Sequence, residues 1–159
     1  MSSREIRLRL PGVALEKGKT ETEDNAMKFM LMMNVPRGTG DYQITQWTPE
    51  AFNAHIQFMK DLNRDLLKSG EFVDAQGLTP PAQAKIVRYG NGSAPVISDG
   101  PFAETKEFLA GFWIIDVEKR ERAYEIAARA SSAPGPDGKP LIIPIELREV
   151  MGVPMPSEG

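Results

Sequence analysis

The sequence predicts an α+β protein in which two β-α-β units contribute to one antiparallel sheet. Three observations support this prediction. Apolar runs of strand length recur along the chain, a strongly patterned helix follows the first of them, and a second helix precedes the last. A hairpin signal lies between the two units. The expected order of elements is therefore β-α-β, an inserted hairpin, and β-α-β.

The first unit starts with Phe29–Met33, a continuous apolar run typical of a strand that is covered on both faces. Thr48-Pro49-Glu50 predicts a helix start, because it combines a hydroxyl N-cap, a proline in the first helical position and an acid in the first turn. Apolar side chains at spacings of three and four then predict one buried stripe: Phe52, Ile56, Met59, Leu62 and Leu66. Gly70 is expected to end this helix, and residues 72–78 form the next strand.

The second unit follows the hairpin, which is predicted by strand-like segments at 85–89 and 94–97 on either side of Gly90-Asn91-Gly92. Residues 109–117 are apolar and aromatic and predict another buried strand, and residues 119–130 predict the second helix. The inward side of that helix is expected to carry Ala123, Ile126, Ala127 and Ala130. The last strand is predicted by alternating apolar residues, namely Ile143, Ile145 and Leu147.

This order is the split βαβ arrangement of ferredoxin-like folds, in which two helices pack on one face of an antiparallel sheet. The other face of such a sheet has no helix to cover it. Because the predicted strands contain Phe, Trp and Met, we expect two copies to pack face to face as a homodimer, a dimeric α+β barrel.

Composition excludes several classes of protein. A length of 159 residues suits one domain with a real core. The net charge of −3 argues against a nucleic-acid platform. With no cysteine and one histidine, disulfide scaffolds, thiolate chemistry and the usual zinc sites are excluded, and no loop has the pattern that cradles phosphate. We expect no cofactor, no metal and no membrane segment, and a cytoplasmic location.

Three segments are expected along the chain. Residues 1–26 contain a polar run at 16–24 with little to bury, and they predict a flexible N-terminal arm. The alternative for this region is an extra edge strand at 5–10, and Met27 is a candidate native start. The compact domain is expected over 27–152 and a C-terminal tail over 153–159.

Five motifs carry a family resemblance: Met27–Met32, Gly77-Leu78-x-Pro80-Pro81, Asp99-Gly100-Pro101-Phe102-Ala103-Glu104-Thr105-Lys106-Glu107, Leu109–Trp113 and Pro144–Met151. Together they closely resemble the DGPF branch of the YCII-related (YciI-like) proteins, and the resemblance covers residues 27–151. It implies a ferredoxin-like domain that usually dimerises around a barrel-like interior with a cleft.

The functions that this resemblance implies are diverse. Most members of the family have no established activity. Some relatives are similar to enzymes of the muconolactone-isomerase type, and one branch dehydrochlorinates a chlorinated hydroxyquinol. Members of the DGPF branch are often encoded with extracytoplasmic-function sigma factors, which implies a regulatory or stress context.

Asp99 and His55 are the candidate catalytic residues. Asp99 stands before a Gly-Pro turn and is a candidate acid or base at a cleft; the alternative is a turn residue whose carboxylate accepts backbone N–H bonds. His55 lies on the flank of the buried stripe, and its alternative is a structural imidazole bonded to a neighbour. In the YciI branch, a first-helix histidine pairs with an aspartate near the end of the second helix. No acid follows that helix here before Asp137, so either Asp99 takes this role or the dyad is absent.

Four further residues are candidates for substrate binding: Phe102, Glu104, Lys106 and Arg88. They lie on a predicted loop and a hairpin edge, where function is common but solvated charges are equally common. The first hypothesis is a cofactor-independent enzyme that performs acid–base chemistry on a polar small molecule, such as an isomerase, lyase or dehalogenase. The alternative is a non-catalytic ligand-binding or accessory protein in a stress response; a purely structural partner module is a third option.

Overall fold

The computed structural model describes residues 27–37, 43–102 and 104–157. The elements in chain order are β1 (Met27–Pro36), η2 (Ile44–Gln46), α2 (Pro49–Ser69), β2 (Phe72–Gly77), η3 (Pro81–Gln83), β3 (Lys85–Arg88), β4 (Val96–Asp99), β5 (Glu107–Val117), α3 (Arg120–Ser131) and β6 (Ile145–Glu149). The expected N-terminal arm, and the alternative strand within it, lie outside the described residues.

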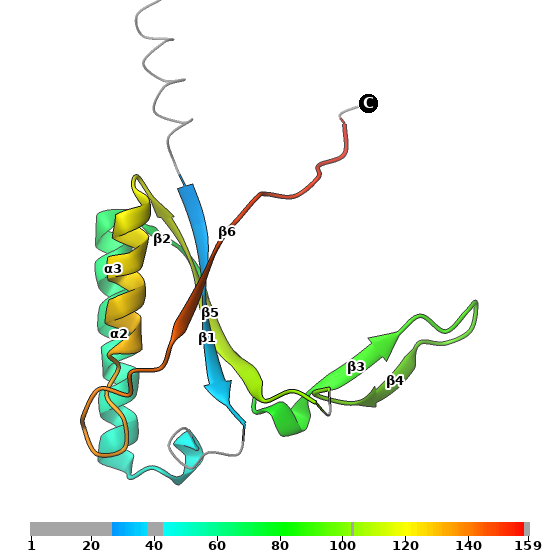
Figure 1. The fold of residues 1–159 in the computed structure, drawn as a ribbon, viewed down its shortest axis with the longest axis horizontal. Coiled ribbons are helices and arrows are strands. Elements are labelled where there is room, and N and C mark those ends of the chain that lie inside the picture. The colour runs from blue at the N-terminus through cyan, green and yellow to red at the C-terminus, as the bar shows by residue number, and fades with distance from the viewer. Residues whose placement is uncertain (1–26, 38–42, 103, 158–159) are drawn as a thin grey trace, which may run out of the picture.

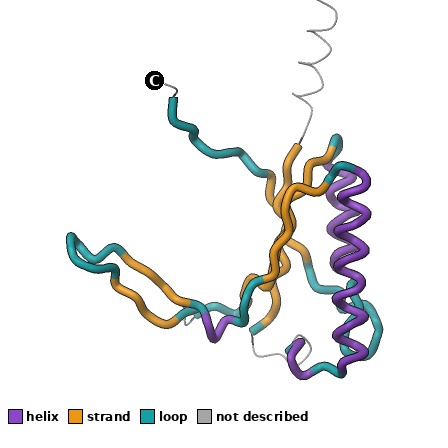
Figure 2. Tube along the Cα trace, turned by 180° about the vertical axis from the view of Figure 1, so that it is seen from behind, coloured by secondary structure: helices purple, strands orange, loops and turns teal. Residues whose placement is uncertain are grey.

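The main sheet has the strand order β2-β5-β1-β6, and every neighbouring pair in it is antiparallel. Helix α2 connects β1 to β2, and α3 connects β5 to β6. Both helices cover the same face of the sheet, as Figures 1 and 2 show from opposite sides. The predicted α+β class is confirmed, with the inserted hairpin between the two β-α-β units.

Helix α2 begins and ends as its sequence predicts. The Thr48 hydroxyl accepts a hydrogen bond from the Ala51 N–H at 3.2 Å, Pro49 follows, and Gly70 ends the helix with a left-handed φ of 77°. The buried stripe differs from the prediction in its first turn. Phe52 is 39% exposed, whereas His55 is 2% exposed and lies on the side of α2 that faces the sheet. The buried face therefore continues from Leu62 and Leu66 through His55, about 60° round the helix from Phe52.

The core lies between the helices and the sheet. Alternate residues of β1 are buried there because successive side chains of a strand point to opposite faces: Phe29, Leu31, Met33 and Val35. Trp113, Ile115 and Val117 of β5 lie on the same face. The inward side of α3 is buried as predicted. Its three alanines and one isoleucine are small enough to let α3 pack close to the strands.

The opposite face of the sheet has an apolar centre, which we call the open face. It consists of two cross-strand pairs, Met30 with Ile114 and Met32 with Phe112. All four side chains are only half-buried, and neither α2 nor α3 lies on this side (Figure 1). Polar partners occupy the flanking strands at the same level, with Gln76 opposite Phe112 and Glu146 opposite Met32. An apolar stripe with a polar margin has the composition of a contact surface.

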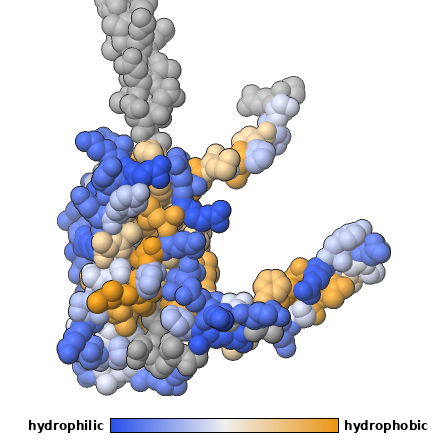
Figure 3. Space-filling view, viewed as in Figure 1, coloured by the Kyte–Doolittle hydropathy of each residue, from blue (hydrophilic) through white to orange (hydrophobic). Residues whose placement is uncertain are grey.

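The β3–β4 hairpin forms a separate two-stranded sheet that extends away from the body (Figures 1 and 2). Its apolar residues are largely exposed: Val87 (61%), Val96 (53%) and Ile97 (64%). Figure 3 shows these hydrophobic atoms on the outstretched hairpin. The hairpin prediction is confirmed in kind, but the second strand is shifted and covers Val96–Asp99. Asp99 is therefore a strand residue opposite Lys85, and the turn begins only at Gly100.

Candidate functional site

A cavity of about 640 Å³ lies between α2 and the helix-facing side of the sheet. It reaches the surface where β1 stops and α2 starts, because the lining residues there, Arg37, Gln43 and Gln46, are exposed. Most of its walls are apolar, and they include Met33, Met59, Leu78, Phe108 and Trp113. This volume lies within the usual range for pockets that bind small molecules. We call it the α2 cavity.

Two glycines leave space in the part of the sheet that lines the α2 cavity. Gly77 of β2 and Gly111 of β5 stand directly opposite each other in the helix-facing register. Both residues line the cavity, together with Ala75 and Ala110. A Cβ on Gly111 would lie 2.8 Å from the Gln76 carbonyl oxygen, whereas a Cβ on Gly77 would meet no atom within 4 Å. A side chain at Gly77 would therefore meet open space beside the cavity that Gly77 lines.

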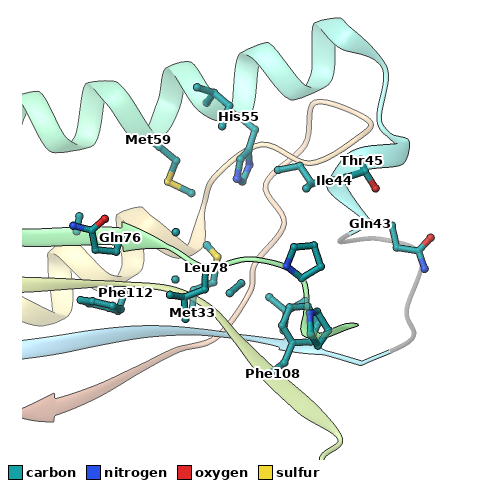
Figure 4. Close-up of a pocket in the computed structure, with 18 of the residues that line it drawn as sticks. Met33, Gln43, Ile44, Thr45, His55, Met59, Gln76, Leu78, Phe108 and Phe112 are labelled. Carbon is teal, nitrogen blue, oxygen red and sulfur yellow. The ribbon is translucent and has the colours of Figure 1, made fainter. Parts of the chain in front are cut away.

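His55 points from α2 into this cavity (Figure 4). Its Nδ1 lies 2.9 Å from the carbonyl oxygen of Pro134. A carbonyl oxygen only accepts, so Nδ1 carries the proton of this bond, and Nε2 carries the lone pair of the neutral ring. Trp47 contacts the imidazole edge-to-face, with 5.3 Å between the ring centroids. The loop carbonyl and the indole thus hold the ring in one orientation.

The ionisation of His55 is shifted toward the neutral form. Burial lowers the pKa of this imidazole below its ordinary value, and the hydrogen bond with Pro134 opposes that shift more weakly. Burial acts in this direction because it disfavours the charged ring. At neutral pH, His55 therefore offers the cavity an uncharged nitrogen base.

Other polar groups line the cavity at both ends. Asn63 follows His55 on the same face of α2, at a spacing of eight residues. Its Oδ1 accepts a 2.9 Å hydrogen bond from the Trp113 indole, which leaves the amide N–H groups as donors. Arg37 lies directly after β1, and Gln43 and Thr45 lie at the end where α2 starts (Figure 4).

Of the residues predicted as functional, the structure brings only His55 into this cavity. Asp99 lies on β4 with a side chain that is 87% exposed, and it forms an ion pair with Lys85 across the hairpin. The Lys85 ammonium, through this hydrogen bond, lowers the pKa of the Asp99 carboxyl. Asp99 does not line the α2 cavity. One chain therefore does not place Asp99 and His55 around the same described pocket.

The four predicted substrate-binding residues also lie outside the cavity walls. Arg88 is exposed on β3, and Phe102 is 59% exposed after the hairpin. Glu104 and Lys106 are exposed on the loop before β5. Lys106 adjoins the cavity through its backbone, because its carbonyl oxygen accepts a 2.8 Å hydrogen bond from the N–H of the lining residue Arg37.

Several lining residues were missed by reasoning from the sequence. Asn63 carries a usable signal, because it extends the polar side of the buried stripe that starts at His55. Gly77 also carries one, since it opens the motif Gly77-Leu78-x-Pro80-Pro81 and precedes a strand end. The sequence around Arg37 and Trp113 contains no signal for a place in the cavity wall, because only the tertiary packing brings these residues beside α2.

Neither a metal-binding cluster nor a membrane-spanning helix is present within the described ranges. No three His, Asp or Glu side chains among them are grouped in a way that would hold a metal ion. None of the helices in that part of the chain is both long and apolar enough to cross a membrane.

Comparison with known proteins identifies the family. The model of the YCII-related domain matches residues 27–134, which span β1 through α3 and include most of the α2 cavity. An uncharacterised protein of Rhizobium meliloti (strain 1021) is 30% identical over 101 residues, which cover 64% of this chain and 81% of that protein. The chain belongs to the YCII-related family.

Proposed function

We propose that this protein binds a small molecule in the α2 cavity and performs acid–base chemistry on it with His55 as the base. One observation carries the proposal: a buried, neutral imidazole, held in a fixed tautomer by Pro134, faces a cavity of ligand size. A general base must be unprotonated at the working pH, and burial favours the unprotonated form of this ring. Isomerisation, lyase chemistry and dehalogenation of a small molecule can each use such a base.

We further propose that the domain is a ferredoxin-like member of the DGPF branch and functions as a cytoplasmic homodimer. The strand order β2-β5-β1-β6, with one helix in each β-α-β unit, supports the fold assignment. The apolar open face supports face-to-face pairing of two sheets. The Asp99-Gly100-Pro101-Phe102 motif supports the branch assignment.

In this proposal, Asp99 reaches a His55 only between two copies. The β3–β4 hairpin carries both Asp99 and Arg88 away from its own body, so a second copy is the structure on which they would act (Figure 1). Phe102, Glu104 and Lys106 follow the same hairpin and would contact the ligand from the same side. The pair of proton carriers would then consist of one residue from each copy.

A second candidate function is ligand binding without turnover, as an accessory protein of stress regulation. The Asp99–Lys85 ion pair favours this alternative, because it lowers the pKa of the carboxyl and so weakens Asp99 as a base. A cavity with a single titratable histidine and mostly apolar walls suits binding as well as catalysis.

Proton exchange in D₂O separates the two functions whatever the product of the reaction is. We expect the full chain to accelerate hydrogen–deuterium exchange on at least one member of a panel of small lactones and ring-halogenated phenols, followed by NMR. His55→Asn keeps an N–H donor for the Pro134 carbonyl but lacks the base, so it should lower the exchange rate by about 10²–10⁴-fold.

The control for this experiment is Gly77→Leu, which fills the cavity from a position with open space around its Cβ. It should abolish binding and exchange together. Binding without exchange in the wild type would select the accessory function. Exchange that persists in His55→Asn would remove His55 as the base.

A further inference from the structure

We propose that the ligand of the α2 cavity is a small organic anion, a monocarboxylate on an apolar body of ring size. This inference rests on the proposed function, since it specifies the ligand of the same cavity. Its first support is the charge of the walls. Among the described lining residues, Arg37 alone carries a formal charge, and no Asp or Glu is present.

The local charge decides the preference, although the whole chain is acidic. The net charge of −3 is spread over a surface of 12126 Å² and is screened over about 8–10 Å at physiological salt. A carboxylate in contact with Arg37 lies well inside that distance. A cation in the same cavity would lose hydration and gain no opposite charge from the described walls.

The uncharged groups of the cavity favour the same class of ligand. The tautomer of His55 places the lone pair on Nε2, which accepts from an O–H or an acidic C–H of the ligand. The amide of Asn63 offers donors, because its oxygen is occupied by the Trp113 indole. None of these groups requires a cationic ligand.

The position of each group gives the ligand an orientation. Arg37 follows the end of β1, which lies at the same end of the molecule as the start of α2 and as His55 (Figures 1 and 4). Met59 lies one helical turn further in, and Asn63 lies a further turn along, about 12 Å from His55 at 1.5 Å per residue. The carboxylate is therefore assigned to Arg37 at the mouth, and the apolar body to the wall formed by Met59 and Trp113.

Three ligands of one shape test this assignment: 1-naphthoate, the neutral 1-naphthamide and the cation 1-naphthylmethylammonium. Binding to the full chain is measured by calorimetry and by tryptophan fluorescence, since Trp113 lines the cavity. We expect affinity to fall in the order anion, amide, cation. Arg37→Gln should weaken naphthoate about fivefold and leave naphthamide within twofold, because only the anion uses the charge.

Arg64→Gln is the matched control, because the Arg64 side chain is 54% exposed on α2 and does not line the cavity. It should leave all three affinities unchanged. In the wild type, raising NaCl from 50 to 500 mM should weaken naphthoate and not naphthamide, which tests the charge without any substitution.

Different results would contradict the anionic ligand and the proposed function of the α2 cavity. Equal affinity for the anion and the cation, with Gly77→Leu abolishing both, would overturn the anion assignment and leave the α2 cavity as the binding site. Absence of binding by all three ligands would also overturn the assignment to ring-sized anions. Binding that Gly77→Leu does not change would instead remove the cavity as the site, and with it the proposed function.

Discussion

The imidazole of His55 is subject to two opposing effects on its pKa. Burial removes water from the charged ring and lowers the pKa, and the Pro134 carbonyl stabilises the Nδ1 proton and raises it. Burial is the larger effect, so the neutral ring dominates. Burial among its surroundings thus shifts this candidate residue toward the neutral form that the proposed function requires.

This shift makes stability depend on the ionisation of His55. The folded-state pKa lies below the ordinary 6.5, so the unfolded chain binds a proton at a higher pH than the folded chain does. The contribution to stability is complete above pH 6.5 and is lost as pH falls from 6.5 through the lower folded pKa. We expect urea unfolding at pH 7.5 and 5.5 to show a larger loss of unfolding free energy in the wild type than in His55→Asn.

Carboxylates with lowered pKa values do not contribute to the loss of unfolding free energy between pH 7.5 and 5.5. Glu71 and Asp65 also have lowered pKa values, because Arg122 and Arg129 hydrogen-bond to them. Their contributions are complete above their ordinary values near 4 and are lost only at lower pH. An equal loss in the wild type and in His55→Asn between pH 7.5 and 5.5 would contradict the assignment to His55.

At the residue scale, the sequence predicts that His55 lies near the buried face of its helix, and the structure agrees. The sequence could not identify Pro134 as its partner, because 79 residues separate the two and the contact depends on how a loop closes. The predicted dyad with Asp99 stays a prediction for a dimer. Within one chain, the nearest opposite charge of Asp99 is Lys85, which the hairpin register places across from it.

Among the elements, the two helices differ in how their N-termini are capped. Thr48 provides α2 with a side-chain acceptor, whereas Lys119 takes the extended N-cap conformation at α3 and makes no side-chain hydrogen bond there. The first is readable from Thr-Pro-Glu in the sequence. The second explains why the start of α3 is less distinct in the sequence.

This difference predicts opposite effects for two substitutions. Thr48→Ala should lower the free energy of unfolding by about 1 kcal/mol, because it leaves an N–H of the first turn without its acceptor. Lys119→Asp should raise it by about 0.5–1 kcal/mol, because it adds a cap and a negative charge at the helix N-terminus. Urea unfolding with unchanged slopes would measure both, and a stabilised Thr48→Ala would contradict the capping account.

The sequence of the β3–β4 hairpin predicts where its turn lies, but not where its second strand begins. Gly90-Asn91-Gly92 identifies its turn region, but the second strand forms later than expected, at Val96–Asp99. Register is fixed strongly only where one face of a strand is buried. The exposed fractions of Val87, Val96 and Ile97 show that neither face of this hairpin has such a constraint within one chain.

Within the described residues, the open face and the β3–β4 hairpin are apolar surfaces that are exposed to different degrees. The order of elements in the sequence predicts the first, because two helices can cover only one face of the sheet. It does not predict that the hairpin stands away from the body, since that depends on the angle at its base. An isolated two-stranded hairpin is marginal in water, which favours a partner for it.

We expect light scattering of the full chain at tens of micromolar to give twice the mass of one chain, which is 17.6 kDa. Met32→Arg places a charge in the centre of the open face and should shift the protein to monomers, because burying an unpaired charge is costly. Tyr124→Arg on the exposed side of α3 is the control and should keep the dimer. A wild type that scatters as a single chain would remove the dimer proposal.

The bond between His55 and Pro134 also determines when the site is completed during synthesis. The described cavity walls extend only as far as Trp113, so a growing chain has made all of them before Pro134 leaves the ribosome. Until then His55 has no loop carbonyl to select its tautomer. Strand β1 likewise gains its second neighbour only when β6 has been synthesised, because β6 pairs with β1 at the edge of the sheet. The imidazole thus acquires its oriented tautomer only after residue 134 has been synthesised, later than the residues that form the described cavity walls.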